Sequence, residues 1–377
     1  MRINLTRALL VGGAAALLVA LLPGVPAWAA PGCGSVLTAD TTLAADLVCA
    51  GDGLVIGATG ITVDLGGHTV SGNGTGNGVN DGGPAGKFNN VTVRNGKING
   101  FTTDVNLFAV HDIVLRGLAL TNATNGLRVS FGNTVTLNVS TVGNAPIRVS
   151  DSPVTTISYT GLTNSSVSLA SSSNNSVFDH NTAANSALAL FEDDKTQVTS
   201  NMFRGAGIIS YSASRNGTFR GNWLEGADIG LEISDQTLAT QVVSNTFVNN
   251  RIGLSVHAPP LGFLNGLGIY ANTFANNTAA GALVEVKNDL GLPSTVTIQR
   301  NRFNHNGLAP AGLTDHLGNP VADGLHIAVP AGAVIAVGSN ATHVNGAYGI
   351  FAVPGTVTDA GGNTSTGNPS GCLGVTC

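Results

Sequence analysis

The sequence predicts an all-β solenoid, because short apolar segments recur at a regular spacing along most of its 377 residues. The clearest repeats start at an asparagine before an apolar or bulky pair, and these asparagines lie 20 to 29 residues apart. Such a spacing is typical of solenoids. Each repeat holds two or three apolar segments of four or five residues, and nothing after the first 30 residues has a sustained helical period. Coils built only from strands give a single-stranded parallel β-helix, here of about a dozen coils.

The composition supports many short strands separated by turns. The chain has 51 glycines and 43% hydrophobic residues, so intrinsic disorder is not expected. Charged residues are only 10% of the chain and the net charge is −5. There is no basic stripe for a phosphate backbone, so nucleic acid is not expected as a partner.

The first 29 residues are predicted to be a secretory signal peptide. Arg2 and Arg7 give a positive start, residues 8–22 are apolar, Pro23 follows, and Ala27-Trp28-Ala29 is a small-x-small cleavage signal. The alternative is a membrane anchor, but the apolar run is shorter than the roughly 20 residues that a bilayer span needs. We therefore expect a secreted, extracellular protein with no membrane span in the mature chain.

Four cysteines near the two ends suggest disulfide-closed caps. Export permits disulfides, and four cysteines allow three pairings. Local pairing of Cys33 with Cys49 and of Cys372 with Cys377 is the simplest, because a rod keeps its ends apart. No Cys-His spacing suggests zinc. The expected parts are an N-terminal cap at 30–59, the β-helix at 60–354, and a C-terminal cap or tail at 355–377.

The repeats themselves have an expected structural purpose. We expect the anchor asparagines at sharp bends, in the left-handed backbone conformation that asparagine tolerates, with stacked copies hydrogen-bonded to one another. Phenylalanines that follow two positions later are expected to stack inside the coil. The anchors are Asn181, Asn201, Asn222, Asn245, Asn272 and Asn301, and the phenylalanines are Phe203, Phe247, Phe274 and Phe303.

Phrases such as "SNTFVNNRIGLSV", which starts at Ser244, resemble the repeats of the right-handed parallel β-helix superfamily of secreted bacterial proteins. This pectate-lyase-like superfamily, with its pectin lyase fold and PbH1 repeats, includes pectate lyases, polygalacturonases and mannuronan epimerases. The resemblance covers about residues 50 to 365, and "GITVDLGGHTVSG" at 60–72 resembles an entry coil. It implies the right hand of the helix. The catalytic motifs of these enzymes are not recognisable here, so their mechanisms are not carried over.

One strand of each repeat offers candidate site residues. Its inward apolar pairs, such as Leu254 and Val256, require the residues between them to point outward. In the later coils these outward residues become charged, and we expect Glu285 beside Ser255 and Lys287 beside His257. Histidine or lysine can serve as a general acid or base with a pKa set by nearby carboxylates. The candidate catalytic residues are Glu232, His257, Glu285, Lys287 and His326. The alternative is a solvated polar face.

An acidic bend offers the only metal candidate. Asp193, Asp194 and Asp235 carry carboxylates of the kind that Ca²⁺ prefers, although a plain solvated turn is the alternative. No other cofactor is expected.

These patterns favour a protein that binds or processes extracellular polysaccharide. The enzymatic version is a lyase, an epimerase or a glycosidase acting on an acidic polymer. The competing hypothesis is a non-catalytic surface, adhesion or matrix rod. A fold alone does not decide between them. We expect a monomer.

Overall fold

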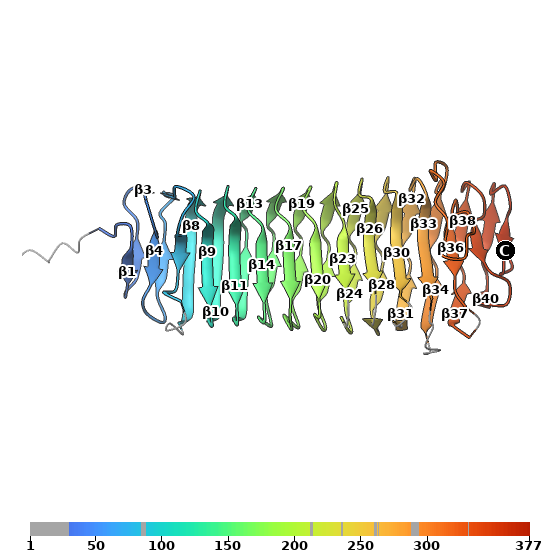
Figure 1. Ribbon diagram of the computed structural model, residues 1–377, viewed down its shortest axis with the longest axis horizontal. Coiled ribbons are helices and arrows are strands. Elements are labelled where there is room, and N and C mark those ends of the chain that lie inside the picture. The colour runs from blue at the N-terminus through green and yellow to red at the C-terminus, as the bar shows by residue number, and fades with distance from the viewer. Residues whose placement is uncertain are drawn as a thin grey trace, which may run out of the picture. The chain divides into compact units, whose positions relative to one another are not determined.

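Strands make up all the regular structure that the computed structural model describes, which covers residues 30–83, 88–211, 214–234, 237–259, 262, 264–287, 294–330 and 332–377. Residues 31–377 form one compact unit, in which the chain winds as a right-handed parallel solenoid (Figure 1). Every pairing between named strands is parallel between one coil and the next, as the repeat predicts. No helix in the described part of the chain has the length and hydropathy to cross a membrane.

Sheet A contains one strand from each coil, and its fifteen described strands give fifteen coils, not the expected dozen. The difference arises because the segments expected to be caps also contribute strands at both ends of the stack. The strands are β1 (Ser35–Leu37), β4 (Leu54–Ile56), β7 (Asn77–Asn80), β9 (Thr103–Phe108), β11 (Asn125–Ser130), β14 (Ile147–Ser150), β17 (Val167–Ala170), β20 (Leu188–Phe191), β23 (Ile208–Tyr211), β26 (Ile229–Ser234), β30 (Ile252–Ala258), β33 (Ala280–Val286), β36 (Leu325–Ala328), β39 (Ile350–Ala352) and β42 (Cys372–Leu373).

The second face follows sheet A in each coil. Two long strands, β8 (Asn89–Asn99) and β10 (His111–Thr121), belong to both the second and the third face. The other strands of the second face are β2 (Thr41–Thr42), β5 (Thr62–Asp64), β12 (Asn133–Asn138), β15 (Thr156–Ser158), β18 (Val177–Asp179), β21 (Gln197–Thr199), β24 (Thr218–Arg220), β27 (Thr237–Leu238), β28 (Gln241–Val243), β31 (Leu264–Tyr270), β34 (Thr295–Gln299), β37 (Val334–Gly338) and β40 (Thr358–Gly361).

The third face completes the coil and carries the residues that follow the anchor asparagines. Its further strands are β3 (Leu47–Val48), β6 (Thr69–Ser71), β13 (Thr141–Gly143), β16 (Gly161–Thr163), β19 (Thr182–Ala184), β22 (Met202–Arg204), β25 (Trp223–Glu225), β29 (Thr246–Val248), β32 (Thr273–Ala275), β35 (Arg302–Asn304), β38 (Ala341–His343) and β41 (Thr364–Thr366).

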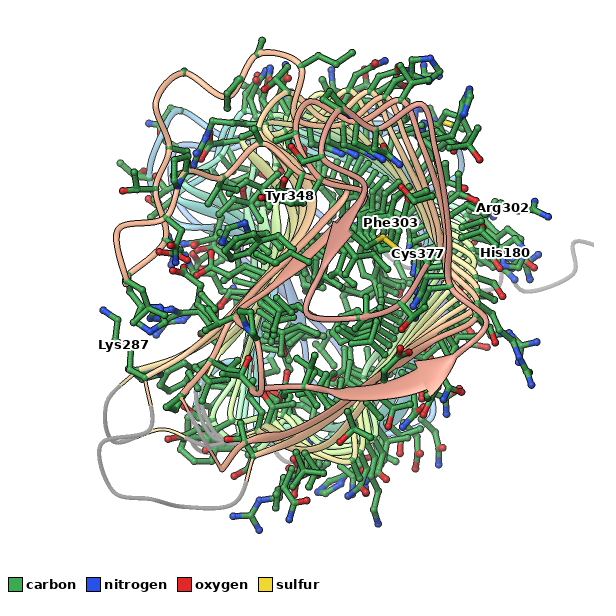
Figure 2. The ribbon with its side chains drawn as sticks, turned by 90° about the vertical axis from the view of Figure 1, so that its right-hand side faces the viewer. His180, Lys287, Arg302, Phe303, Tyr348 and Cys377 are labelled. Atoms are coloured by element: carbon green, nitrogen blue, oxygen red, sulfur yellow. A yellow bond between two sulfur atoms is a disulfide. The ribbon has the colours of Figure 1, made fainter. Side chains whose placement is uncertain are left out.

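The predicted phenylalanines stack inside the solenoid. Phe247 and Phe274 have ring centroids 4.8 Å apart and ring planes 4° apart, and Phe303 continues the stack 4.7 Å beyond Phe274. Figure 2 shows Phe303 within the coil. The rings fit because glycines line the neighbouring corner. A Cβ added to Gly253 would lie 2.5 Å from the carbonyl oxygen of Gly281 and 3.0 Å from the ring of Phe274, so this position excludes larger residues.

The anchor asparagines form a buried hydrogen-bonded ladder, as predicted. Both the backbone and the side-chain amide of Asn245 donate to Oδ1 of Asn272, at 2.8 and 3.0 Å, and the same contact repeats up to Asn363. The predicted backbone conformation was wrong. The left-handed residue is the one before each anchor, for example Ser244 with a φ of 56°. The bend therefore lies one residue earlier, and the asparagine side chain is used to satisfy the backbone of the turn.

A second asparagine ladder runs beside the first and was not predicted. Asn250, Asn277, Asn306 and Asn345 are each joined to the asparagine of the next coil, ending at Asn368. These residues lie five positions after the anchors Asn245, Asn272 and Asn301 and after Asn340, which continues the first ladder, so the pattern was present in the sequence. Both ladders satisfy buried backbone carbonyls at the corners of the coil.

Disulfides close the chain near both ends of the solenoid. Cys33 is bonded to Cys49 with 5.5 Å between their Cα atoms, and Cys372 to Cys377 with 6.1 Å. These are the local pairings that the sequence favoured. The boundaries of the cap segments and of the signal peptide stay predictions.

Candidate functional site

Glu232, His257 and Glu285 lie on three successive strands of sheet A. Glu232 is in register with Ser255, and His257 is in register with Glu285. The expectation that Glu285 stands beside Ser255 and Lys287 beside His257 was therefore wrong. In β33 the residues Ala282, Val284 and Val286 all face inward, so alternation alone allowed two registers. The true register places a carboxylate beside His257.

Lys287 lies just beyond the end of β33. Its backbone N–H donates to the carbonyl oxygen of Ala258 at 3.1 Å, and its side chain is exposed. Figure 2 shows this side chain at the periphery, away from the interior of the coil. Lys287 thus lies two residues beyond Glu285, which occupies the position beside His257 where Lys287 was expected.

A long loop lies against sheet A beside Glu285, and we call residues 305–323 the covering loop. Oε1 of Glu285 accepts the backbone N–H of His316 at 2.8 Å and lies 3.3 Å from Nδ1 of the same histidine. Val321 from the loop packs with Leu283 in a small apolar cluster on the outside of sheet A. The loop is therefore a fixed wall beside His257 and Glu285.

His326 is buried under the covering loop, so its expected place on a solvated face was wrong. Its side chain is 0% exposed. Nδ1 lies 2.6 Å from Oδ2 of Asp323, and Nε2 lies 3.0 Å from Oδ2 of Asp315 in the loop. The ring stacks on Phe351, with 4.4 Å between centroids. With both nitrogens and a ring face occupied, His326 cannot reach a ligand outside.

Asp315 organises the tip of the covering loop through the same carboxylate. Its Oδ1 accepts the backbone N–H groups of Leu317 at 2.9 Å and of Asn319 at 2.7 Å. Burial tends to raise the pKa of Asp315, but hydrogen bonds from His326 and Asn319 outweigh burial and hold the pKa below its usual value. His326 and Asp315 thus anchor the loop to β36.

Glu232 borders a depression of about 290 Å³ on the corner between the third face and sheet A. Asp228 also lines it and forms an ion pair with Arg251, whose Nη2 lies 3.1 Å from Oδ2. Small residues form the rest of the wall: Ala187, Gly205, Ala206, Gly207 and Ala227, with Ile209 and Ile229. The half-exposed carboxylate of Glu232 is therefore accessible from this depression.

The acidic bend does not gather its carboxylates within the described residues. Asp193 is 1% exposed, and neither of its carboxylate oxygens has a hydrogen-bond partner there. Burial raises the pKa of Asp193 to about 7. Asp194 accepts the backbone N–H of Arg215 at 2.9 Å, and Asp235 lies outside the described residues. Asp193 is buried and Asp194 is half-exposed in the turn, and the described residues form no group of three metal-binding side chains there.

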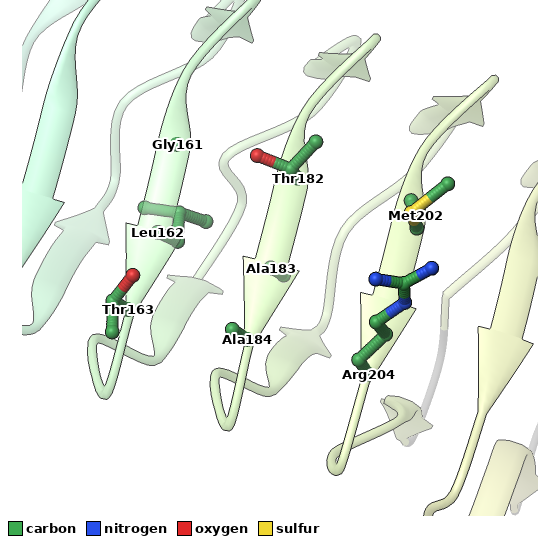
Figure 3. A pocket seen from close by; sticks show the side chains of 8 residues that line it. All are labelled: Gly161, Leu162, Thr163, Thr182, Ala183, Ala184, Met202 and Arg204. Atoms are coloured by element: carbon green, nitrogen blue, oxygen red, sulfur yellow. The ribbon is translucent and has the colours of Figure 1, made fainter.

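The third face carries a polar and aromatic group that sequence reasoning missed. Trp223 is 41% and Met202 38% exposed, on neighbouring strands. The indole N–H of Trp223 donates to Glu225 at 3.1 Å, and Nε of Arg204 lies 3.4 Å from the same carboxylate oxygen. Met202 and Arg204 line a depression of about 200 Å³ (Figure 3). Phe203 and Leu224 are buried, and side chains alternate along a strand. This pattern would have placed their neighbours on β22 and β25 on the outside.

Comparisons with known proteins bear on the fold and the family. A family model described as "Periplasmic copper-binding protein (NosD)" matches residues 55–260. No curated protein matches. The catalytic unit of an α-1,3-glucanase from Streptomyces thermodiastaticus is 15% identical, with a TM-score of 0.45, over 89% of this chain and 61% of that one. The A-module of an Azotobacter vinelandii mannuronan C-5 epimerase, AlgE6, is 12% identical, with a TM-score of 0.40, over 90% of each chain.

A third similar structure is the Dettilon tailspike protein, at 15% identity and a TM-score of 0.41, over 90% of this chain and 62% of that one. This chain thus spans about three fifths of the glucanase unit and of the tailspike. At these identities and scores the likeness gives no information about activity.

The copper named in the family description has no matching ligand set in the described residues. All four cysteines are in disulfides, and Met202 is the one methionine there. Soft sulfur ligands are thus scarce, and His326 has both nitrogens occupied by carboxylates. Within the described ranges, no three His, Cys, Asp or Glu side chains come together to hold a metal. The family itself follows from the extent of the match: because it spans residues 55–260, more than half of the chain, the protein belongs to the NosD family.

Proposed function

We propose that this protein contacts polysaccharide outside the cytoplasm through the part of sheet A that carries Glu232, His257 and Glu285. The observation that carries the proposal is the placement of three ionisable side chains on three successive strands beside a fixed loop. Successive strands lie about 4.8 Å apart, so a polymer along the solenoid axis would meet one rung after another.

The pair of His257 and Glu285 supplies the groups on this surface that could transfer protons. An imidazole beside a carboxylate can accept or donate a proton at a sugar carbon or a glycosidic oxygen. The backbone N–H of His316 donates to Oε1 of Glu285 and so holds this carboxylate in position. Lys287, at the exposed end of β33, can contact a carboxylate of an acidic polymer. A lyase, an epimerase or a glycosidase acting on such a polymer is the enzymatic form of the proposal.

A non-catalytic rod is the second candidate, and one observation favours it. Glu285 is engaged by the covering loop, and His326 is fully enclosed, so two of the five candidate residues are used for structure. In this form the protein binds polysaccharide or another surface without chemical turnover.

Export is part of the proposal. Two disulfides are compatible with an oxidising compartment, and the family description says periplasmic. Residues 1–29 would then be removed as a signal peptide, and the mature chain would act as a monomer in the periplasm or outside the cell.

The proposal is tested with a panel of acidic and neutral polysaccharides, with and without Ca²⁺. Binding is followed by affinity electrophoresis, and turnover by the absorbance of unsaturated products and by new reducing ends. We expect retention by at least one polymer. Glu192→Gln, which changes an exposed carboxylate in a turn two coils before Glu232, is the matched control for Glu232→Gln. If no polymer is retained and no product forms, the proposal is wrong.

A further inference from the structure

We propose that Trp223, Met202 and the depression beside them on the third face form a subsite for one pyranose ring of an oligosaccharide. The inference rests on the proposed function, because it names a second surface for the same class of ligand. It begins from two large, partly exposed apolar side chains that stand side by side on neighbouring strands, next to a depression.

The depression exists because the outward residues on two neighbouring strands are small. Gly161 and Thr182 precede Met202 and Trp223 in one outward column. Thr163 and Ala184 precede Arg204 and Glu225 in the other. The sheet surface is therefore low at β16 and β19 and rises at β22 and β25, which leaves the hollow of about 200 Å³ (Figure 3).

The indole is held in place before any ligand arrives. Its N–H donates to Glu225 at 3.1 Å, and Nε of Arg204 lies 3.4 Å from the same carboxylate oxygen. The remaining exposed surface of Trp223 is then the apolar ring. Fixing a side chain in advance reduces the entropy lost on binding.

A sugar ring fits this arrangement better than a protein partner does. A pyranose has a face of C–H groups and a rim of hydroxyls. The apolar face suits Met202, which lines the hollow, with Trp223 on the adjoining strand, while Thr163, Thr182 and Arg204 offer polar groups around the hollow. A stable protein interface takes roughly 20–30 residues from each partner, whereas eight residues line this hollow. An added peptide strand needs an open edge, but β19 is paired on both sides.

The subsite also adjoins the surface of the proposed function. Arg204 lines this hollow, while the next residues, Gly205 and Ala206, line the depression that Glu232 borders. The two depressions therefore lie on either side of one turn. An oligosaccharide that crosses this turn can contact both Trp223 and Glu232.

Intrinsic fluorescence gives a direct test, because the chain has only two tryptophans, Trp28 and Trp223. In a full chain with Trp28→Phe, emission reports on Trp223 alone. Oligosaccharides of glucose, mannuronic acid and galacturonic acid are titrated as probes. We expect a saturable emission change with at least one probe. Trp223→Ala should weaken that probe's binding, measured by calorimetry, about tenfold or more, and Trp223→Phe should retain most of it.

Phe131→Ala, which removes a 56% exposed ring from a turn in an earlier coil, is the matched control and should bind as the parent does. Thermal unfolding checks that each variant is folded. If the parent binds a probe and Trp223→Ala binds it equally well, the subsite is wrong while the proposed function stands. If the parent binds no oligosaccharide or polysaccharide, the proposed function fails and the subsite with it. A dimer that dissociates in Trp223→Ala, with sugar binding unchanged, would also overturn the subsite in favour of self-association.

Discussion

Nε2 of His326 lies 3.0 Å from Oδ2 of Asp315, and this contact joins strand β36 of the solenoid to the covering loop. The same imidazole binds Asp323 through Nδ1 at 2.6 Å. A histidine that alternation placed on the outside of the sheet has thus become the centre of a buried polar cluster. The loop beside the candidate site is positioned by this cluster, so loop geometry and solenoid stability are coupled.

His326→Ala should destabilise the protein by about 3–5 kcal/mol, because it leaves the carboxylates of Asp315 and Asp323 buried without their partner. The free energy of unfolding from urea titration measures the effect. His343→Ala, at an exposed position on β38, should change it by about 0.5 kcal/mol or less. Equal effects of the two substitutions would contradict the anchoring role.

The Asp315→Asn substitution should destabilise the protein near neutral pH but have little effect on stability in acid. The pKa of Asp315 is lower in the folded protein than its usual value, so its ionised form contributes stability above the unfolded pKa of about 3.9. That contribution is lost as the pH falls through the lower folded pKa. The melting temperatures of parent and variant should therefore differ at pH 6, and this difference should shrink as the pH falls below the unfolded pKa of about 3.9. A difference that does not change with pH would show that the charge is not involved.

Asp104→Asn should stabilise the protein at pH 8. Asp104 is fully buried, both its oxygens lack partners in the described structure, and burial raises its pKa to about 8. Between about pH 4 and pH 8 the folded state then binds more protons than the unfolded state, so stability falls as pH rises. Relative to the parent, the variant should gain on the order of 2 kcal/mol of unfolding free energy at pH 8 and little at pH 4. Urea unfolding measures both values. A variant less stable than the parent at pH 8 would contradict this account.

Asn245→Ala should cost about 2–3 kcal/mol of unfolding free energy, because it breaks one link of the buried ladder. Its side-chain amide donates to Asn272 and to the carbonyl oxygen of Phe219, and its Oδ1 accepts from Asn222. Asn304→Ala, at a half-exposed position on β35, is the control and should change stability by about 0.5 kcal/mol or less. If Asn245→Ala lowered the unfolding free energy only slightly, water would be replacing the hydrogen bonds of the ladder, which contradicts this account.

The periodic features of the fold were predictable, because stacking forces each coil to repeat the same inward residues. Phe247 and Asn245 could be placed from the repeat alone. The bend was expected at Asn245 because asparagine tolerates a left-handed backbone. In the structure Ser244 takes that conformation, and Asn245 is placed by the hydrogen bonds of its side chain. The register of Glu285 was missed because Ala282, Val284 and Val286 allow two alignments.

The candidate site was less predictable for a different reason. Alternation tells which residues leave the interior of the coil, but not which of them a loop will cover. His326 and Glu285 both point out of the sheet and are both met by the covering loop. Trp223 was missed because only one strand of each repeat was searched for outward side chains.

The central claim is that polysaccharide binds across Glu232 and His257, and the most direct measurement is the affinity of the full chain for the polymer panel before and after Glu232→Gln and His257→Ala. The account predicts that at least one polymer binds, and that the double substitution weakens this binding about tenfold or more with unfolding free energy unchanged. If the parent binds no polymer, or if the double variant binds as tightly as the parent, the claim is contradicted.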